Sequence, residues 1–322
     1  MAGLSERAQK LALRLPGPLR DSLRSGRKRY RSARYRLRER VRPTRLTSAD
    51  VADALRECGL DQGDACFVQA AMSAFGGFED GPASVVDAIC NLVGDRGLVA
   101  MPAYSLTGPA IDHLAADPLF DPVETPSRMG AISEELRLRP GTLRSVHPTH
   151  STAVRGPGAE EIIAGHETAP TPFGDGTPFP RIRDRNALQV FFGCGTGAIT
   201  MYHSFECVRE PPFPLDVFAD RRYDARCLDA GGRLITVSTL VHNPALHPGR
   251  IDSNPRLQEI YRDAILAAGG KAVALGRGEI IAIRLPALFA VFEDLLSRGV
   301  TIYDHPVPDK TPALKPQERV HD

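Results

Sequence analysis

Hydrophobic positions in residues 47–300 alternate between the spacing typical of helices and the spacing typical of strands. A helix is predicted over residues 47–59, because Thr47 and Asp50 have the spacing of an N-terminal cap. A strand at 66–70, a helix at 82–93 and a strand at 98–101 are expected to follow. This strand–helix–strand order predicts an α/β fold in which helices pack on a sheet.

The rest of the chain continues the same pattern. Helices are predicted at residues 130–138, 159–164, 198–208, 256–268 and 286–297, and strands at 188–192, 233–238, 272–275 and 280–283. Ala230-Gly231-Gly232 is typical of a hairpin turn. Because no repeat or low-complexity linker interrupts residues 46–322, we expect one domain there, preceded by a separate extension at 1–45.

The extension is strongly basic, with 15 Lys or Arg and three acidic residues. Leu4, Leu11 and Leu15 would share one face of a helix that Pro16 ends. Such a segment suits a solvated tail as well as it suits adhesion to an anionic membrane surface or a polyphosphate. Peripheral membrane contact is therefore one expectation for residues 1–45, and no nucleic acid partner is expected.

Residues 46–322 are acidic, with 25 Lys or Arg against 36 Asp or Glu. This excess is expected to attract cationic small molecules. The chain as a whole is 42% hydrophobic and 25% charged, as in globular proteins. No apolar run approaches the ~18–20 residues of a membrane helix, and Lys10 and Arg14 interrupt any signal-peptide core. A cytoplasmic location is expected.

The cysteines do not indicate a metal site or a disulfide framework. The six are Cys58, Cys66, Cys90, Cys194, Cys207 and Cys227. They form no C-x-x-C pair and no zinc-type spacing with histidine, so we expect no bound metal. Several lie in apolar runs, where a reduced buried thiol is the common state.

The most informative chemistry lies in Thr200-Met201-Tyr202-His203-Ser204-Phe205-Glu206. On a helix, Thr200, His203 and Glu206 would share one face, where a carboxylate one turn away can orient an imidazole and raise its basicity. This spacing suits a general base. Alone it is weak evidence, because a helical histidine is more often an ordinary core or surface residue.

The order of several motifs adds specificity. R-S-x-H-P-x-x-S at 144–151, His166-Glu167, Phe173-Gly174-Asp175-Gly176-Thr177-Pro178 and T-x-x-H-x-x-E at 200–206 follow one another. Upstream, Phe75-Gly76 and the segment 125–134, which begins Thr125-Pro126-Ser127-Arg128, add to the pattern. Over residues 47–300 the chain resembles the aminoglycoside 3-N-acetyltransferase family. The resemblance implies a mixed sheet with flanking helices.

The resemblance also implies a function. It is transfer of an acetyl group from acetyl-CoA to an amino group of an aminoglycoside or amino sugar. His203 is expected to be the base, oriented by Glu206, with His147 as the next candidate. Thr200 and Asp252 are expected to contact the acceptor. The alternative for His147 is a structural role in its loop.

A further set of residues is expected to hold coenzyme A. Arg144 suits a phosphate, and backbone amides of the loop that ends at Ser151 suit the thioester oxyanion. At the end of the first strand, however, the chain has Gln69-Ala70-Ala71 where the family usually has His and Ser. The expected cofactor residues are Gln69, Met72, Ser73, Gly76, Arg144, Ser145 and Ser151.

Two other readings remain open in the sequence. The altered segment would suit a binding protein that no longer uses coenzyme A, or an enzyme that takes another acyl donor. Cys207 or Cys194 would suit an acyl-accepting nucleophile paired with His203, although Glu206 would disfavour a thiolate nearby.

Overall fold

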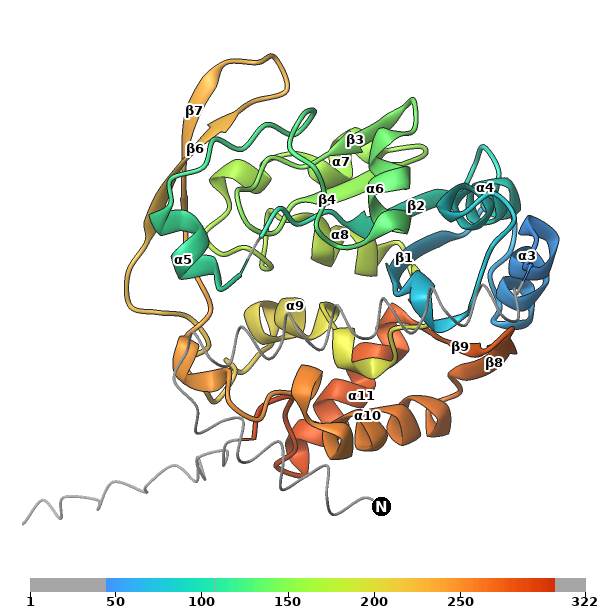
Figure 1. Cartoon of the computed structure of the whole chain (residues 1–322). Coiled ribbons are helices and arrows are strands. Elements are labelled where there is room, and N and C mark those ends of the chain that lie inside the picture. The colour runs from blue at the N-terminus through green and yellow to red at the C-terminus, as the bar shows by residue number, and fades with distance from the viewer. Residues whose placement is uncertain (1–44, 107, 305–322) are drawn as a thin grey trace, which may run out of the picture.

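The computed structural model describes residues 45–304 except residue 107 (Figure 1). The strands are β1 (Ala65–Ala70), β2 (Leu98–Pro102), β3 (Thr142–Arg144), β4 (Thr152–Arg155), β5 (Leu188–Phe192), β6 (Tyr223–Leu228), β7 (Leu234–Thr239), β8 (Lys271–Leu275) and β9 (Gly278–Arg284). Within these residues they form a seven-stranded sheet, in the order β3-β4-β2-β1-β5-β9-β8, and a separate β6-β7 hairpin.

The large sheet is mixed. Its centre is parallel, since β1 pairs with β2 on one side and with β5 on the other in the same direction. The outer strands are antiparallel to their neighbours, with β4 against β2 and β9 against β5. The predicted α/β fold with a mixed sheet and flanking helices is confirmed.

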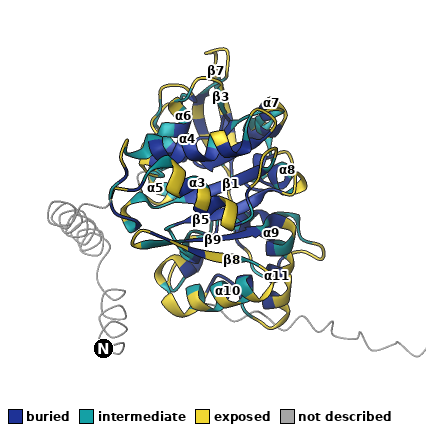
Figure 2. Cartoon of the chain, turned by 90° about the vertical axis from the view of Figure 1, so that its right-hand side faces the viewer, coloured by how far each residue is buried: buried dark blue, intermediate teal, exposed yellow. Residues whose placement is uncertain are grey.

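Helices cover both faces of this sheet (Figures 1 and 2). The α-helices are α3 (Ser48–Glu57), α4 (Pro82–Val93), α5 (Ala110–Ala115), α6 (Ala131–Leu138), α7 (Ala159–Ile163), α8 (Pro178–Asp184), α9 (Met201–Val208), α10 (Pro255–Ala267) and α11 (Leu285–Ser297). The short 3-10 turns are η1 (Met72–Ala74), η2 (His166–Thr168), η3 (Thr196–Ala198), η4 (Pro244–Leu246) and η5 (Ile251–Ser253).

The alternation of side chains along β1 separates two hydrophobic cores. Phe67 faces a core that includes residues of α8, α9, α10 and α11. Its neighbours Cys66 and Val68 face the other core, which α3, α4 and α6 cover. Successive strand residues point to opposite faces, so a strand buried on both sides has to be apolar throughout. The run Ala65-Cys66-Phe67-Val68 meets that requirement.

Local sequence signals set several of the helix ends. The predicted cap of α3 forms as a capping box, in which the Thr47 hydroxyl accepts from the Asp50 amide at 3.1 Å. The Asp50 carboxylate in turn accepts from the Thr47 amide at 2.8 Å. Pro82 begins α4, and Gly94 follows its last residue with a positive φ.

Some short elements are not predicted by the sequence. Residues 144–151 are predicted as a loop, whereas the structure has β3 up to Arg144 and β4 from Thr152. Strands of three or four residues are too short to show a clear alternation. The elements α5, α8 and β6 are also not predicted. The helix predicted from residue 198 starts at Met201 as α9, because η3 occupies 196–198.

The predicted basic extension and its membrane contact lie outside the described residues, apart from Arg45. None of the helices in the described part of the chain has both the length and the apolar character required to cross a bilayer.

Candidate active site

Helix α9 carries the predicted acid–base pair. His203 Nδ1 lies 2.9 Å from Glu206 Oε2, because residues three apart on a helix share one face. Other residues of α9 hold the helix in the core: the rings of Tyr202 and Phe205 pack against Phe292 with centroids 4.9 and 5.5 Å apart. The spacing read from the sequence therefore gives the expected contact on a well-packed helix.

The Glu206 side chain is fully buried, and its two oxygens have different partners. Oε1 accepts a hydrogen bond from the Tyr303 hydroxyl at 2.6 Å, while Oε2 faces His203. Burial raises the pKa of Glu206. The charge and hydrogen bond of His203, together with His242, lower it by more than burial raises it, so the pKa is about 2. The carboxylate is thus ionised at neutral pH and only accepts hydrogen bonds.

This arrangement assigns the tautomer of the neutral His203 ring. Because Glu206 supplies no proton, the hydrogen between the two side chains is assigned to His203 Nδ1. The Nε2 atom then carries the lone pair. The His203 side chain is 14% exposed, so the imidazole reaches the surface of the site while the carboxylate behind it does not.

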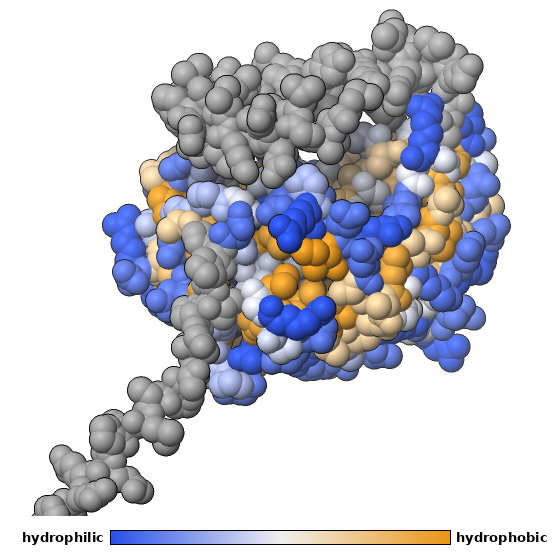
Figure 3. Space-filling view, turned by 90° about the horizontal axis from the view of Figure 1, so that it is seen from below, coloured by the Kyte–Doolittle hydropathy of each residue, from blue (hydrophilic) through white to orange (hydrophobic). Residues whose placement is uncertain are grey.

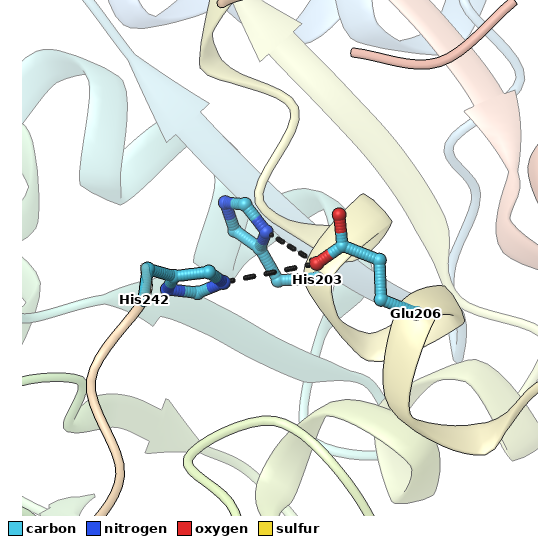
Figure 4. Close-up of side chains that lie close together, drawn as sticks. All are labelled: His203, Glu206 and His242. Carbon is cyan, nitrogen blue, oxygen red and sulfur yellow. Dashed lines mark hydrogen bonds and ion pairs between the residues drawn. The ribbon is translucent and has the colours of Figure 1, made fainter. Parts of the chain in front are cut away.

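A second histidine, His242, joins this pair and was missed from the sequence (Figure 4). Its Nε2 lies 3.7 Å from Glu206 Oε2, and its ring centroid lies 4.1 Å from that of His203. Burial and the nearby His203 lower the pKa of His242 to about 4, so this ring is neutral at neutral pH. A single histidine after Val241 carries no local signal. An isolated antiparallel β-bridge between His242 and Phe218 holds His242 at this position.

His147 lies deeper, in a cluster of buried histidines. Its Nδ1 accepts the His150 backbone amide at 3.0 Å, and its Nε2 lies 3.0 Å from the Thr239 hydroxyl. Its ring stacks on His166 at 4.5 Å, and His166 Nδ1 lies 2.8 Å from the Ser145 hydroxyl. Burial, and then the neighbouring His166, lowers the pKa of His147 well below its usual value. Both its nitrogens are engaged within the protein.

Arg144 is also turned into the protein. Its Nε donates to Ser151 Oγ at 3.0 Å, and its other nitrogens donate to the carbonyls of Thr125 and Ala103. The guanidinium lies over the Phe120 ring, 4.8 Å from its centroid. Burial lowers the pKa of Arg144 to about 9. The expected phosphate ligand thus has internal partners that hold the loop between β3 and β4.

Gln69 joins the end of β1 to the start of α9. Its Nε2 donates to Thr200 Oγ1 at 2.8 Å, and its Oε1 accepts the Thr200 amide at 3.3 Å. Gln189 of the adjacent strand β5 donates to the same Oε1 at 3.3 Å. The residue that departs from the family pattern is therefore buried and hydrogen-bonded, and it positions the first residue of the T-x-x-H-x-x-E motif.

The remaining expected contacts lie around the carboxyl ends of the parallel strands. Met72 and Ser73 lie on η1, directly after β1, and Ser73 is exposed. Gly76 follows them with φ 109°. Asp252 lies on η5, is exposed, and pairs with Arg250 at 3.1 Å. Ligands of open α/β sheets commonly bind at this edge.

The two cysteines considered as nucleophiles are poorly suited to that role. Burial raises the pKa of Cys194 and that of Cys207 to about 12, and the charge of Glu206 adds to the effect on Cys207. A thiol in such a setting remains protonated at neutral pH. The six cysteines are free in the structure, in agreement with the expected reduced state.

The sequence profile of the aminoglycoside 3-N-acetyltransferase family matches residues 67–297. The chain belongs to this family. The matched region begins in β1, ends in α11 and contains the His203–Glu206 pair. The aminoglycoside 3-N-acetyltransferase resemblance read from the ordered motifs is thus confirmed.

Individual relatives of the family give the extent of the similarity. Aminoglycoside N(3)-acetyltransferase VII of Streptomyces paromomycinus is 30% identical over 180 residues, which are 52% of this chain and 62% of that protein. Aminoglycoside N(3)-acetyltransferase III of Salmonella is 28% identical over 271 residues, covering 79% of this chain and 90% of that protein. The chain thus spans about three fifths of the length of the first curated relatives that it matches.

Among solved structures, AAC-IIIb in a binary complex with CoASH has the same fold. The two superpose with a TM-score of 0.66 at 24% sequence identity, over 79% of this chain and 97% of that one. This likeness supports the mixed-sheet architecture described above.

Proposed function

We propose that this chain transfers the acetyl group of acetyl-CoA to an amino group of an aminoglycoside or a related amino sugar. Family membership supports the reaction class. The names of the relatives support the acceptor, and the CoASH complex of AAC-IIIb supports the donor. The observation that carries the proposal is the His203–Glu206–Tyr303 hydrogen-bonded series, which gives a partly exposed base an ionised, buried partner.

In this proposal His203 acts through Nε2. The acceptor nitrogen attacks the thioester carbonyl carbon, and Nε2 takes the proton that the nitrogen loses as the N–C bond forms. Cleavage of the C–S bond then releases the thiolate of coenzyme A, to which the imidazolium returns the proton. Glu206 stabilises the imidazolium and fixes the ring, since its own position is held by Tyr303.

Substrate contacts are proposed on both sides of this base. Met72, Ser73 and Gly76 follow the carboxyl end of β1 and are placed to line the donor site. Ser145 and Ser151 have internal hydrogen bonds, as Arg144 does, and we assign to these three the shaping of their loop. Asp252 and the acidic excess of residues 46–322 favour a cationic acceptor.

The test is an acetyl-CoA turnover assay that follows thiol release across a panel of aminoglycosides and amino sugars. We expect acceptor-dependent release, with the acetylated amine identified by mass spectrometry. Calorimetric titration with acetyl-CoA separates the enzyme from the binding-protein reading. Absence of both acetyl-CoA binding and acceptor-dependent release across the panel would reject the proposal.

A further inference from the structure

His203, Glu206 and His242 form a compact group of three metal-type donors. Within the residues that the structure describes, their donor atoms all lie within 4.8 Å of one another. Two of the contacts go to one oxygen and are drawn as dashed lines in Figure 4. Nδ1 of His203 lies 2.9 Å and Nε2 of His242 lies 3.7 Å from Glu206 Oε2. The group combines a helix with a segment that follows the β6-β7 hairpin.

An independent feature of His242 points to a ligand. Its Nε2 is buried, its side chain is only 10% exposed, and its one polar neighbour, Glu206 Oε2 at 3.7 Å, is too distant for a normal hydrogen bond. A buried imidazole nitrogen in such a weak contact is unfavourable unless something closer occupies it. The ring is directed at Glu206, so an ion beside that carboxylate would give it a partner (Figure 4).

The surroundings of the three donors are those of a metal site. The other oxygen of Glu206 accepts a hydrogen bond from the Tyr303 hydroxyl. Carboxylates that bind metals are usually held by such an additional hydrogen bond. Phe173 and Phe218 cover the histidines, with ring centroids 5.1 Å from His203 and 5.2 Å from His242. Apolar cover strengthens the attraction between a cation and the carboxylate.

The donor chemistry selects the class of ion. Two imidazole nitrogens and one carboxylate oxygen suit Zn²⁺ and its first-row neighbours, whereas Mg²⁺ and Ca²⁺ prefer oxygen. Donors bound tetrahedrally at about 2.0–2.1 Å from zinc lie roughly 3.4 Å apart. The observed 2.9 and 3.7 Å separations lie on either side of that value, and all three donor atoms lie within 4.8 Å of one another. Side-chain rotations that bring the two histidine nitrogens closer together would gather the ligands.

We propose that His203, Glu206 and His242 bind a Zn²⁺ ion that inhibits the acetyl transfer. The ion takes the place of the hydrogen on His203 Nδ1, which moves through solvent to Nε2, so the ring stays neutral. A water molecule fills the open fourth position. Zinc-bound His203 then carries its hydrogen on Nε2 and has no lone pair there with which to take a proton from the acceptor. The inhibition rests on the proposed function, but zinc binding does not.

The binding test uses the full chain without a polyhistidine tag, cleared of metal with a chelator. Titration with ZnCl₂ is followed by calorimetry, and CoCl₂ is followed by the visible absorption of four-coordinate Co²⁺. We expect one ion per chain. His242→Gln should weaken binding at least about 10-fold. His113→Gln replaces a histidine of α5 outside the group and should bind as the parent does.

If the parent binds no zinc, the proposal is overturned. Equal zinc binding by the parent and the His242→Gln variant would also overturn it, because it would show an adventitious ion only. If the His242→Gln variant does not fold, zinc X-ray absorption of the parent decides. Two imidazole ligands support the site, and oxygen ligands alone reject it.

A separate assay tests inhibition. Where the parent acetylates an acceptor, Zn²⁺ should abolish turnover and a chelator should restore it, in the parent and in His113→Gln. Turnover that persists with zinc bound would reject the inhibitory role. If no acceptor is acetylated, the proposed function fails, whereas the Co²⁺ spectrum still reports on the site.

Discussion

At the scale of single residues, the hydrogen bonds of His203 and Glu206 on α9 decide which of their atoms remain available to a substrate. His203 Nδ1 is held by Glu206, whose second oxygen is held by Tyr303. In the proposed mechanism, this leaves His203 Nε2 as the atom that accepts a proton from an acceptor amine. A buried, ionised carboxylate behind a partly exposed imidazole stabilises an imidazolium without competing for the substrate.

His203→Ala tests this assignment. We expect kcat to fall by about 10²–10⁴, the usual effect of losing a positioned general base. Acetyl-CoA affinity, measured by calorimetry, should barely change, because the imidazole acts on the proton of the acceptor. Turnover within a few-fold of the parent would show that another group is the base.

Glu206→Gln should reduce kcat less than His203→Ala does. The amide keeps one oxygen acceptor, but it gives up the charge that stabilises the imidazolium. It also has only one acceptor oxygen for the two donors, His203 Nδ1–H and the Tyr303 hydroxyl. Steady-state kinetics of the two variants, measured with the same acceptor, give the comparison. A loss in Glu206→Gln as large as that in His203→Ala would mean that the charge itself is indispensable.

At the scale of elements, the junction between β5 and α9 decides where the helix that carries His203 and Glu206 starts. Gly193 ends the strand with φ 72°, and the chain there passes very close to the segment after β1. A Cβ atom at Gly193 would lie 2.4 Å from Phe75 Cε2 and 2.8 Å from Ala74 Cβ. Together with the Gln69–Thr200 hydrogen bonds, this close approach fixes α9 against the sheet.

Gly193→Ala should therefore destabilise the fold more than the same change at a glycine of similar φ. Gly165 has φ 74°, and the nearest atom that a Cβ there would meet lies 3.8 Å away, an ordinary contact distance. A positive φ costs each alanine variant about 1–2 kcal/mol. Gly193→Ala should lower the free energy of unfolding by roughly 1–3 kcal/mol more, because it adds a clash. Urea denaturation of the two variants measures the difference, and equal values would contradict the close packing.

At the scale of the whole molecule, the buried histidines couple the fold to pH. His166 is fully enclosed, with Ser145, the Pro172 carbonyl and the ring of His147 around it and Arg181 nearby. Burial lowers the pKa of His166 to about 3, and that of His147 is lowered well below its usual value. Both are therefore neutral in the folded chain, whereas in the unfolded chain they take up protons near pH 6.5.

The fold should lose stability on mild acidification. As the pH falls below about 6.5, the unfolded chain binds protons that the folded chain does not. Each such histidine then lowers the free energy of unfolding by about 1.4 kcal/mol per pH unit until its folded pKa is approached. Chemical denaturation between pH 7.5 and 5 measures this slope. This pH interval lies above the range in which most carboxylates titrate. Constant stability across that interval would mean that these histidines are protonated in the folded protein.

The sequence by itself determined the features that depend on neighbours along the chain. The longer helices and the central strands, the Thr47 cap, the hairpin turn and the contact of His203 with Glu206 all follow from fixed local spacings. The motif order also sufficed to recognise the family, because it does not require knowing how the segments pack.

Only the tertiary structure decided what surrounds that pair. Tyr303 reaches Glu206 from 97 residues away, and His242 arrives after a hairpin whose path no local pattern specifies. Burial likewise turned Arg144 towards internal carbonyls and gave Gln69 partners on two other elements. The physical reason is that a polar side chain takes its role from the partners that folding brings to it, and these come from packing between distant segments.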